Sequence, residues 1–158
     1  MPRVTARDIT QMKAKGEKIP MITAYDYTSA RLADEAGVPL LLVGDSLAMV
    51  IYGLETTRGV SLDAMINHGA AVVRGSERAC VIVDLPHGTY EESPELALAS
   101  SQRVMAETGA QGIKLEGGVE MADTIRQLTE NGIPVLGHIG LLPQKAESRG
   151  GFRIQGKD

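Results

Sequence analysis

The 158-residue chain has few aromatic residues, one cysteine and no long apolar run. With four Tyr, one Phe and no Trp, its core must be built from aliphatic side chains and Met. A single cysteine excludes an internal disulfide, and Cys80, inside the apolar run ACVIVDLP, is expected to be a buried structural thiol rather than a nucleophile. No run approaches the ~18 apolar residues of a transmembrane helix, and the N-terminal segment lacks an apolar signal core. A soluble, cytoplasmic protein is therefore expected.

The charge balance is mildly acidic. Sixteen Lys and Arg against 20 Asp and Glu give a net charge of −4, and no basic block is present. This argues against nucleic acid or an anionic membrane as the main partner. The chain is 43% hydrophobic and 23% charged, which is typical of an ordinary globular protein. Its length predicts a single domain over residues 1–158.

Five apolar, strand-like runs alternate with stretches of helical periodicity. Strands are expected at Ile19–Tyr25, Leu40–Val43, Ala79–Val83, Gly112–Leu115 and Pro134–His138. Helices are expected near residues 5–15, 30–36, 62–75, 94–108 and 119–130. Ser61 and the pair Ser93-Pro94 are predicted to begin two of these helices. Alternation of this kind indicates a parallel sheet with helical crossovers.

Four of the predicted strands end in a titratable side chain. These are Asp45, Asp84, Glu116 and His138. Ligand sites of α/β proteins lie at the carboxyl ends of the strands, so the four side chains are expected to meet in one active site. The lack of GxGxxG and Walker motifs, and carboxylates on three successive strands, favour a (β/α) barrel over a flat doubly wound sheet. A complete barrel has eight units in ~250 residues, so the fold is either a smaller open sheet or part of a barrel.

The three carboxylates suggest a metal site. Their oxygens are hard ligands that suit Mg²⁺ or Mn²⁺ better than zinc. Three carboxylates at one mouth would repel each other and raise one another's pKa values, and a divalent cation would relieve this. The alternative is that each one caps a helix or pairs with a surface arginine. Three carboxylates at corresponding positions of successive strands favour the metal site over this alternative.

Three further side chains are candidates for binding a substrate. Strand period places Lys114 on the same face as Glu116, so Lys114 should project inward, either to pair with Glu116 or Asp84, or to bind an anionic substrate, or both. Ser46 either holds a substrate carboxylate or caps the next turn. His138 either donates a hydrogen bond to a ligand oxygen or satisfies a strand end.

These groups together suggest a reaction class. A divalent ion beside a lysine can chelate a 2-oxo acid through its carboxylate and keto oxygens. The ion would act as a Lewis acid that lowers the pKa of the neighbouring C–H group and stabilises the enolate. The residues alone predict metal-assisted enolate chemistry and no more.

Several segments resemble the ketopantoate hydroxymethyltransferase family in order and spacing, over about Thr5 to Lys157. They are TAYDYTSARLADEAGV, LLVGDSLAMVIYG, VDLPHGTYEES, GIKLEGG, GIPVLGHIGLLPQ and the closing GGFRIQGK. The resemblance implies a (β/α)₈ TIM barrel of the phosphoenolpyruvate mutase/isocitrate lyase type, of which this chain has about five units. It also implies transfer of a hydroxymethyl group from 5,10-methylenetetrahydrofolate to 3-methyl-2-oxobutanoate, giving 2-dehydropantoate, the first step toward pantothenate. A homo-oligomer, suggested to be a decamer, is implied as well.

The resemblance also implies roles for individual residues. Asp45 and Asp84 match the ligands of one Mg²⁺ per subunit, and Glu116 matches a third acidic group that reaches the ion directly or through water. The oxo acid is expected to contact Asp45, Ser46, Asp84 and Lys114. His138 matches the active-site histidine.

The family's catalytic base is a glutamate with no counterpart among these residues, and strands six to eight also have none. This chain alone is therefore expected to be inactive. The alternatives are a noncatalytic fragment that binds a metal or a 2-oxo acid, and a related oxo-acid lyase.

Overall fold

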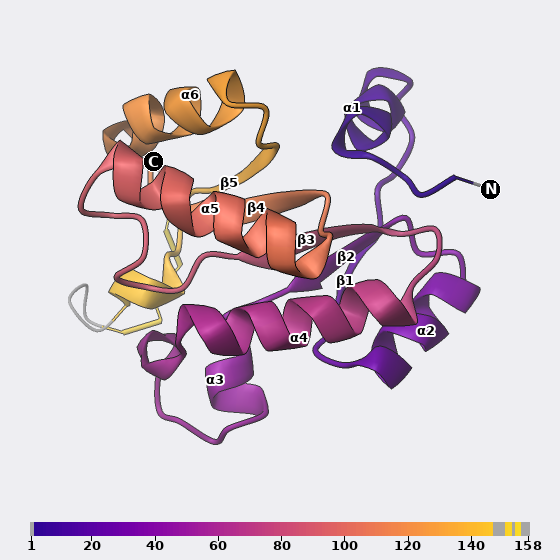
Figure 1. Ribbon diagram of the computed structural model, residues 1–158, viewed down its shortest axis with the longest axis horizontal. Helices are drawn as coiled ribbons and strands as arrows, with labels where there is room; N and C mark the ends of the chain where they lie inside the picture. Colours follow the sequence, from indigo (N-terminus) through magenta and orange to yellow (C-terminus); the bar gives the residue numbers. More distant parts are fainter. Residues whose placement is uncertain (1, 147–150, 153, 156–158) are drawn as a thin grey trace.

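A five-stranded parallel sheet forms the centre of the computed structural model, which describes residues 2–146, 151, 152, 154 and 155 (Figure 1). Its strands are β1 Met21–Thr23, β2 Leu40–Val43, β3 Cys80–Asp84, β4 Gly112–Glu116 and β5 Val135–His138. They pair in chain order, β1-β2-β3-β4-β5, and every pairing is parallel. A doubly wound sheet reverses its strand order at a switch point, so the consecutive order is that of a partial β/α barrel.

Helices lie on both faces of this sheet. They are α1 Ala6–Ala14, α2 Tyr27–Glu35, α3 Leu47–Val50, α4 Leu62–Gly75, α5 Pro94–Thr108 and α6 Ala122–Glu130. Three short 3₁₀ helices are η1 Thr57–Gly59, η2 Val119–Met121 and η3 Pro143–Lys145. Helices α2, α4, α5 and α6 cover the outer face of the sheet, whereas α1 lies against its inner face. Along the sheet, α2 packs on α4, α4 on α5 and α5 on α6 (Figure 1). Side chains of these helices form the main core with the outward-facing apolar residues of the strands, among them Leu41, Val83 and Ile113.

The starts of α4 and α5 were predicted from capping residues, and the structure confirms both. The hydroxyl of Ser61 accepts the Ala64 N–H at the start of α4, and the hydroxyl of Ser93 accepts the Leu96 N–H at the start of α5. Gly109 ends α5 with φ of +75°, a conformation that a residue with a Cβ rarely adopts.

Several local features differ from the sequence prediction. Helix α2 begins at Tyr27 rather than near residue 30, and α6 begins at Ala122 because residues 119–121 form the 3₁₀ helix η2. Strand β1 covers only Met21–Thr23 of the predicted Ile19–Tyr25, because it lies at a sheet edge and pairs with β2 alone. The connection from β2 to α4 contains the short helices α3 and η1, where no helix was predicted. Neither is long enough to show a helical period in the sequence.

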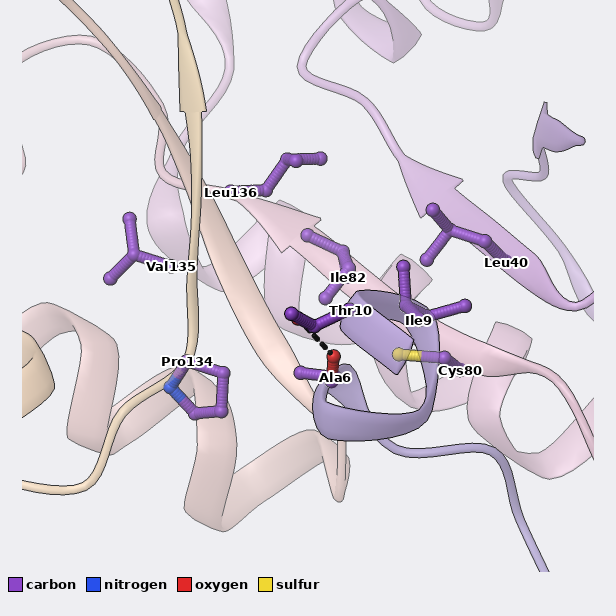
Figure 2. Close-up of a pocket in the computed structure, with 9 residues that line it drawn as sticks. All are labelled: Ala6, Ile9, Thr10, Leu40, Cys80, Ile82, Pro134, Val135 and Leu136. Carbon is purple, nitrogen blue, oxygen red and sulfur yellow. Dashed lines mark hydrogen bonds between the residues drawn. The ribbon is translucent and has the colours of Figure 1, made fainter. Parts of the chain in front are cut away.

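The inner face of the sheet is apolar at the amino ends of the strands. We call this region the floor, and it consists of Leu40, Cys80, Ile82 and Leu136, which cluster with Ile9 of α1. Figure 2 shows the cavity between α1 and the floor side chains of β2, β3 and β5. Cys80 is buried as predicted, and burial raises the pKa of its thiol to about 11, which disfavours the thiolate that a nucleophile needs.

No helix in the described part of the chain is both long enough and apolar enough to cross a membrane. The closing GGFRIQGK segment, which contributed to the family resemblance, lies partly outside the described residues.

Candidate active site

The carboxyl ends of the strands surround a cavity of about 280 Å³, which we call the mouth. All six predicted site residues line it: Asp45, Ser46, Asp84, Lys114, Glu116 and His138. Five of them follow or end a strand, and Lys114 lies within β4, two residues before its end, so the parallel sheet delivers all six to the same edge. The structure therefore brings the predicted constellation together in one place.

Asp84 and Lys114 form a buried ion pair at the centre of the mouth. Lys114 Nζ lies 2.6 Å from Asp84 Oδ1, and the two side chains are 12% and 4% exposed, respectively. Burial raises the pKa of the Asp84 carboxyl to about 6, an effect that Lys114 opposes and that the charge of Asp45 increases. The other oxygen, Asp84 Oδ2, accepts the backbone N–H of Asp45 at 3.1 Å. Lys114 thus points inward as predicted and is already paired, with its ammonium group still lining the cavity.

Asp45 is buried beside this pair. Burial raises the pKa of its carboxyl, and a hydrogen bond from Gln144 acts in the opposite direction. In that bond the side-chain amide of Gln144 donates to Asp45 Oδ2 at 2.8 Å. Two neighbouring carboxyls, Asp45 and Asp84, therefore both have raised pKa values, as expected of acidic groups that share a desolvated site.

Glu116 and His138 stand on the neighbouring strands β4 and β5. Burial raises the pKa of Glu116 to about 7, and its Oε2 accepts the backbone N–H of Gln144 at 3.1 Å. His138 Nδ1 lies 3.3 Å from Glu116 Oε1 but forms no hydrogen bond with a described residue. Burial first, then the charge of Lys114, lowers the pKa of His138, which favours the neutral ring.

Ser46 occupies the first position before α3, yet its side chain makes no capping hydrogen bond. Its hydroxyl lies 2.8 Å from the hydroxyl of Tyr25, which follows β1. The capping alternative is therefore wrong, and Ser46 is held at the mouth. A Cβ at Gly44 would lie 2.7 Å from Ser46 Oγ, so a larger residue at this position would push the serine hydroxyl out of its place.

Among the residues of the mouth region that the sequence analysis missed, two are polar and buried. Thr57, on η1, is 3% exposed and lines the cavity. Its hydroxyl is near enough to Asp45 to lower the pKa of that carboxyl, but no described residue gives it a hydrogen bond of ordinary geometry. Gln144, on η3, is also 3% exposed. Both lie on three-residue 3₁₀ helices, which are too short to show a periodic pattern, so no periodicity in their local sequence placed them at the mouth.

The donor set fits a hard divalent cation. Asp45 and Asp84 offer carboxylate oxygens, and burial, which raises the pKa of both carboxyls, disfavours their charged forms, a cost that a bound cation would offset. The unpartnered Thr57 hydroxyl adds a neutral oxygen beside them. Across the described residues, no three His, Cys, Asp or Glu side chains are arranged to hold an ion together. The two aspartates thus fit direct ligands better than Glu116, whose carboxyl faces Gln144 and His138.

Comparisons with known proteins point to one family. The family model described as ketopantoate hydroxymethyltransferase matches residues 3–158. A curated protein of Chloroflexus aurantiacus (strain J-10-fl), named 3-methyl-2-oxobutanoate hydroxymethyltransferase, is 58% identical over 155 residues, covering 98% of this chain and 54% of that protein. The protein of the same name from Paramagnetospirillum magneticum is 57% identical, with 98% and 56% covered. The chain thus spans about half the length of the curated relatives it matches.

Solved structures support the predicted fold. The structure of 2,3-dimethylmalate lyase, a PEP mutase/isocitrate lyase superfamily member, matches with a TM-score of 0.63 and 19% identity, covering 85% of this chain and 52% of that chain. Phosphonopyruvate hydrolase matches with a TM-score of 0.66 and 16% identity, covering 78% and 48%. At such identities the likeness shows the fold alone. It confirms the predicted β/α-barrel fold, of which the described part of the chain contains five strands.

Proposed function

Because the chain belongs to the ketopantoate hydroxymethyltransferase family, we propose that it supplies the oxo-acid- and cation-binding part of an enzyme making 2-dehydropantoate. The enzyme would transfer a hydroxymethyl group from 5,10-methylenetetrahydrofolate to 3-methyl-2-oxobutanoate. The observation that carries the proposal is the buried mouth, where Asp45, Asp84 and Lys114 meet around a cavity of about 280 Å³. We also propose that this enzyme is a cytoplasmic homo-oligomer. The family resemblance implies a decamer.

The mouth has the chemistry needed to hold a small 2-oxo acid. The ammonium of Lys114 would attract the substrate carboxylate, and the hydroxyl of Ser46, fixed by Tyr25, would donate to it. The unpartnered hydroxyl of Thr57 would gain a hydrogen-bond partner when a ligand enters. The ammonium of Lys114 and the hydroxyls of Ser46 and Thr57 approach the cavity from several sides. Such an arrangement suits a small anion that carries both a carboxylate and a keto oxygen.

Asp45 and Asp84 would hold Mg²⁺, and Glu116 would be a third acidic group that reaches the ion directly or through water. A bound divalent cation would withdraw electrons from the C2 carbonyl and so acidify the C3–H of the oxo acid. His138, whose Nδ1 has no hydrogen-bond partner among the described residues, would donate a ring N–H to a ligand oxygen. The resemblance assigns the base that removes the C3 proton to a glutamate with no counterpart in this chain, so we propose that this chain binds and orients the oxo acid and does not deprotonate it.

Calorimetric titration of 3-methyl-2-oxobutanoate into the chain, with Mg²⁺ or with EDTA, tests this proposal. We expect binding that requires the cation. Asp45→Asn should weaken it at least tenfold, because a ligand charge is lost while the oxygen that accepts from Gln144 remains. Asp123→Asn is the matched control, since it also removes one carboxylate but from an exposed position on α6, and it should leave the affinity within twofold.

Absence of cation-dependent binding by the unaltered chain would overturn the proposal. A turnover assay distinguishes a chain that only binds the oxo acid from one that also catalyses the reaction. It follows 2-dehydropantoate by mass spectrometry in the presence of 5,10-methylenetetrahydrofolate. Binding without turnover is the expected result for this chain alone. Product formation by the chain alone would show that one of its own residues acts as the base.

A further inference from the structure

Gln144 is the one described residue that hydrogen-bonds the side chains of both Asp45 and Glu116. Its side-chain nitrogen donates to Asp45 Oδ2 at 2.8 Å and to the carbonyl of Leu85 at 3.0 Å. Its backbone N–H donates to Glu116 Oε2 at 3.1 Å. One residue from η3 therefore connects the ends of β2, β3 and β4.

The orientation of the Gln144 amide is fixed by its surroundings. Its Oε1 accepts from the hydroxyl of the buried Tyr90 at 2.6 Å, and that hydroxyl in turn accepts the backbone N–H of Glu116 at 3.2 Å. Reversing the amide would turn Oε1 toward the carboxylate of Asp45 and the carbonyl of Leu85, two groups that can only accept. The network allows a single arrangement in which each donor has an acceptor.

We propose that Gln144 is a positioning residue that aims the carboxylates of Asp45 and Glu116 into the mouth and thereby sets its affinity for the cation and the oxo acid. This inference rests on the proposed function of the mouth. Carboxylate side chains rotate freely unless hydrogen bonds hold them, and a site needs its ligands fixed within a fraction of an ångström. Gln144 can hold both carboxylates from outside the cavity, because it hydrogen-bonds them without lining the cavity itself.

The test compares Gln144→Met with Thr108→Val in the complete chain. Methionine keeps the length of the glutamine side chain but cannot donate to Asp45. Thr108 is a buried polar residue at the end of α5 whose hydroxyl bonds the Val104 carbonyl and the Ala110 N–H, outside the mouth. Both variants lose buried hydrogen bonds, so both should be less stable. Mn²⁺ affinity by electron paramagnetic resonance and oxo-acid affinity by calorimetry are measured at a temperature where each variant is folded.

We expect Gln144→Met to weaken Mn²⁺ and oxo-acid binding at least tenfold, and Thr108→Val to leave both within twofold. Equal losses in the two variants, or normal binding in Gln144→Met, would show that Gln144 is merely structural. If the unaltered chain binds neither probe, the proposed function fails and this inference fails with it.

Nuclear magnetic resonance of the unaltered chain gives an independent measurement should Gln144→Met not fold. The side-chain N–H protons of Gln144 should exchange slowly with solvent and should shift when Mg²⁺ is added, because their acceptor Asp45 changes its environment. Protected protons that do not respond to a cation that binds would overturn the inference.

Discussion

The two ends of the inner sheet face differ sharply, although the same strands build both. At the floor, β3 presents Cys80 and Ile82, and two residues further along the same face it presents Asp84. On β5 the same step leads from Leu136 to His138. Strand period alone keeps these residues on one face, so a change of two positions turns a hydrocarbon surface into a charged, buried site.

The comparison shows how stability and function are divided in this fold. The floor is covered by α1, and its buried apolar side chains stabilise the fold. The mouth instead holds carboxyl groups whose charged forms are disfavoured by burial. A barrel tolerates such groups because the apolar layers below support them. Changes at the mouth should therefore alter binding and pH dependence, and also stability where a buried charge loses its partner, whereas changes at the floor should alter stability alone.

Lys114→Met should have the largest effect, because it leaves the buried Asp84 carboxylate without its cation. We expect the free energy of unfolding at pH 8, measured with urea, to fall by about 4 kcal/mol. Lys145→Met is the control, since its partner Glu120 is at the surface and the loss should stay below about 1 kcal/mol. Similar losses in both variants would mean that the mouth is far wetter than the structure indicates.

The pH dependence of stability should distinguish a mouth with cation from one without it. The folded pKa values of about 6 for Asp84 and about 7 for Glu116 exceed the ordinary values of 3.8 and 4.5, so their stabilising contribution is full at low pH and disappears as pH rises through 6 to 7. The lowered pKa of His138 acts in the opposite sense. In EDTA we expect a net loss of about 3 kcal/mol between pH 5 and pH 8.

Magnesium should reduce this loss, because a cation compensates the ionised carboxylates. Urea unfolding at both pH values, with EDTA or with Mg²⁺, measures the difference. Glu116→Gln should flatten the dependence in EDTA. An identical slope with and without Mg²⁺ would argue that no cation binds at the mouth.

At the floor, Ile82→Ala should lower the free energy of unfolding by about 2 kcal/mol and leave oxo-acid affinity unchanged. Ile82 is buried against α1 and contributes no polar group. Leu32→Ala, on an exposed face of α2, is the matched control and should change stability by less than about 0.5 kcal/mol. A loss of binding in Ile82→Ala would show that floor and mouth are not separable.

The sequence predicted the regular half of this structure well. Apolar runs bounded by glycine and by capping serines located β2, α4 and α5 closely, and strand period placed Lys114 inward. These predictions succeed because they depend on neighbours in the chain. The convergence of Asp45, Asp84 and Glu116 followed from one further rule, that parallel strands end at the same edge.

Contacts between loops could not be predicted in this way. Gln144 reaches Asp45 across 99 positions of sequence, and Thr57 enters the mouth from a three-residue 3₁₀ helix. No periodicity connects such residues, since their positions depend on how the whole barrel packs. The sequence also left open whether Ser46 caps α3, because a capping serine and a serine held by Tyr25 look alike in a sequence.

Thr57→Val gives the smallest effect and the sharpest contrast between the two ends. The buried Thr57 hydroxyl has no hydrogen-bond partner in the described structure, so replacing it with a methyl group should change stability by less than about 0.5 kcal/mol. Oxo-acid affinity, measured by calorimetry, should fall about fivefold, which is about 1 kcal/mol, because the ligand loses a donor. Thr10→Val on α1, where the hydroxyl bonds the Ala6 carbonyl beside the floor, should leave the affinity unchanged (Figure 2). If Thr57→Val instead lowers stability and spares binding, the hydroxyl is satisfied within the folded chain and the mouth does not use it.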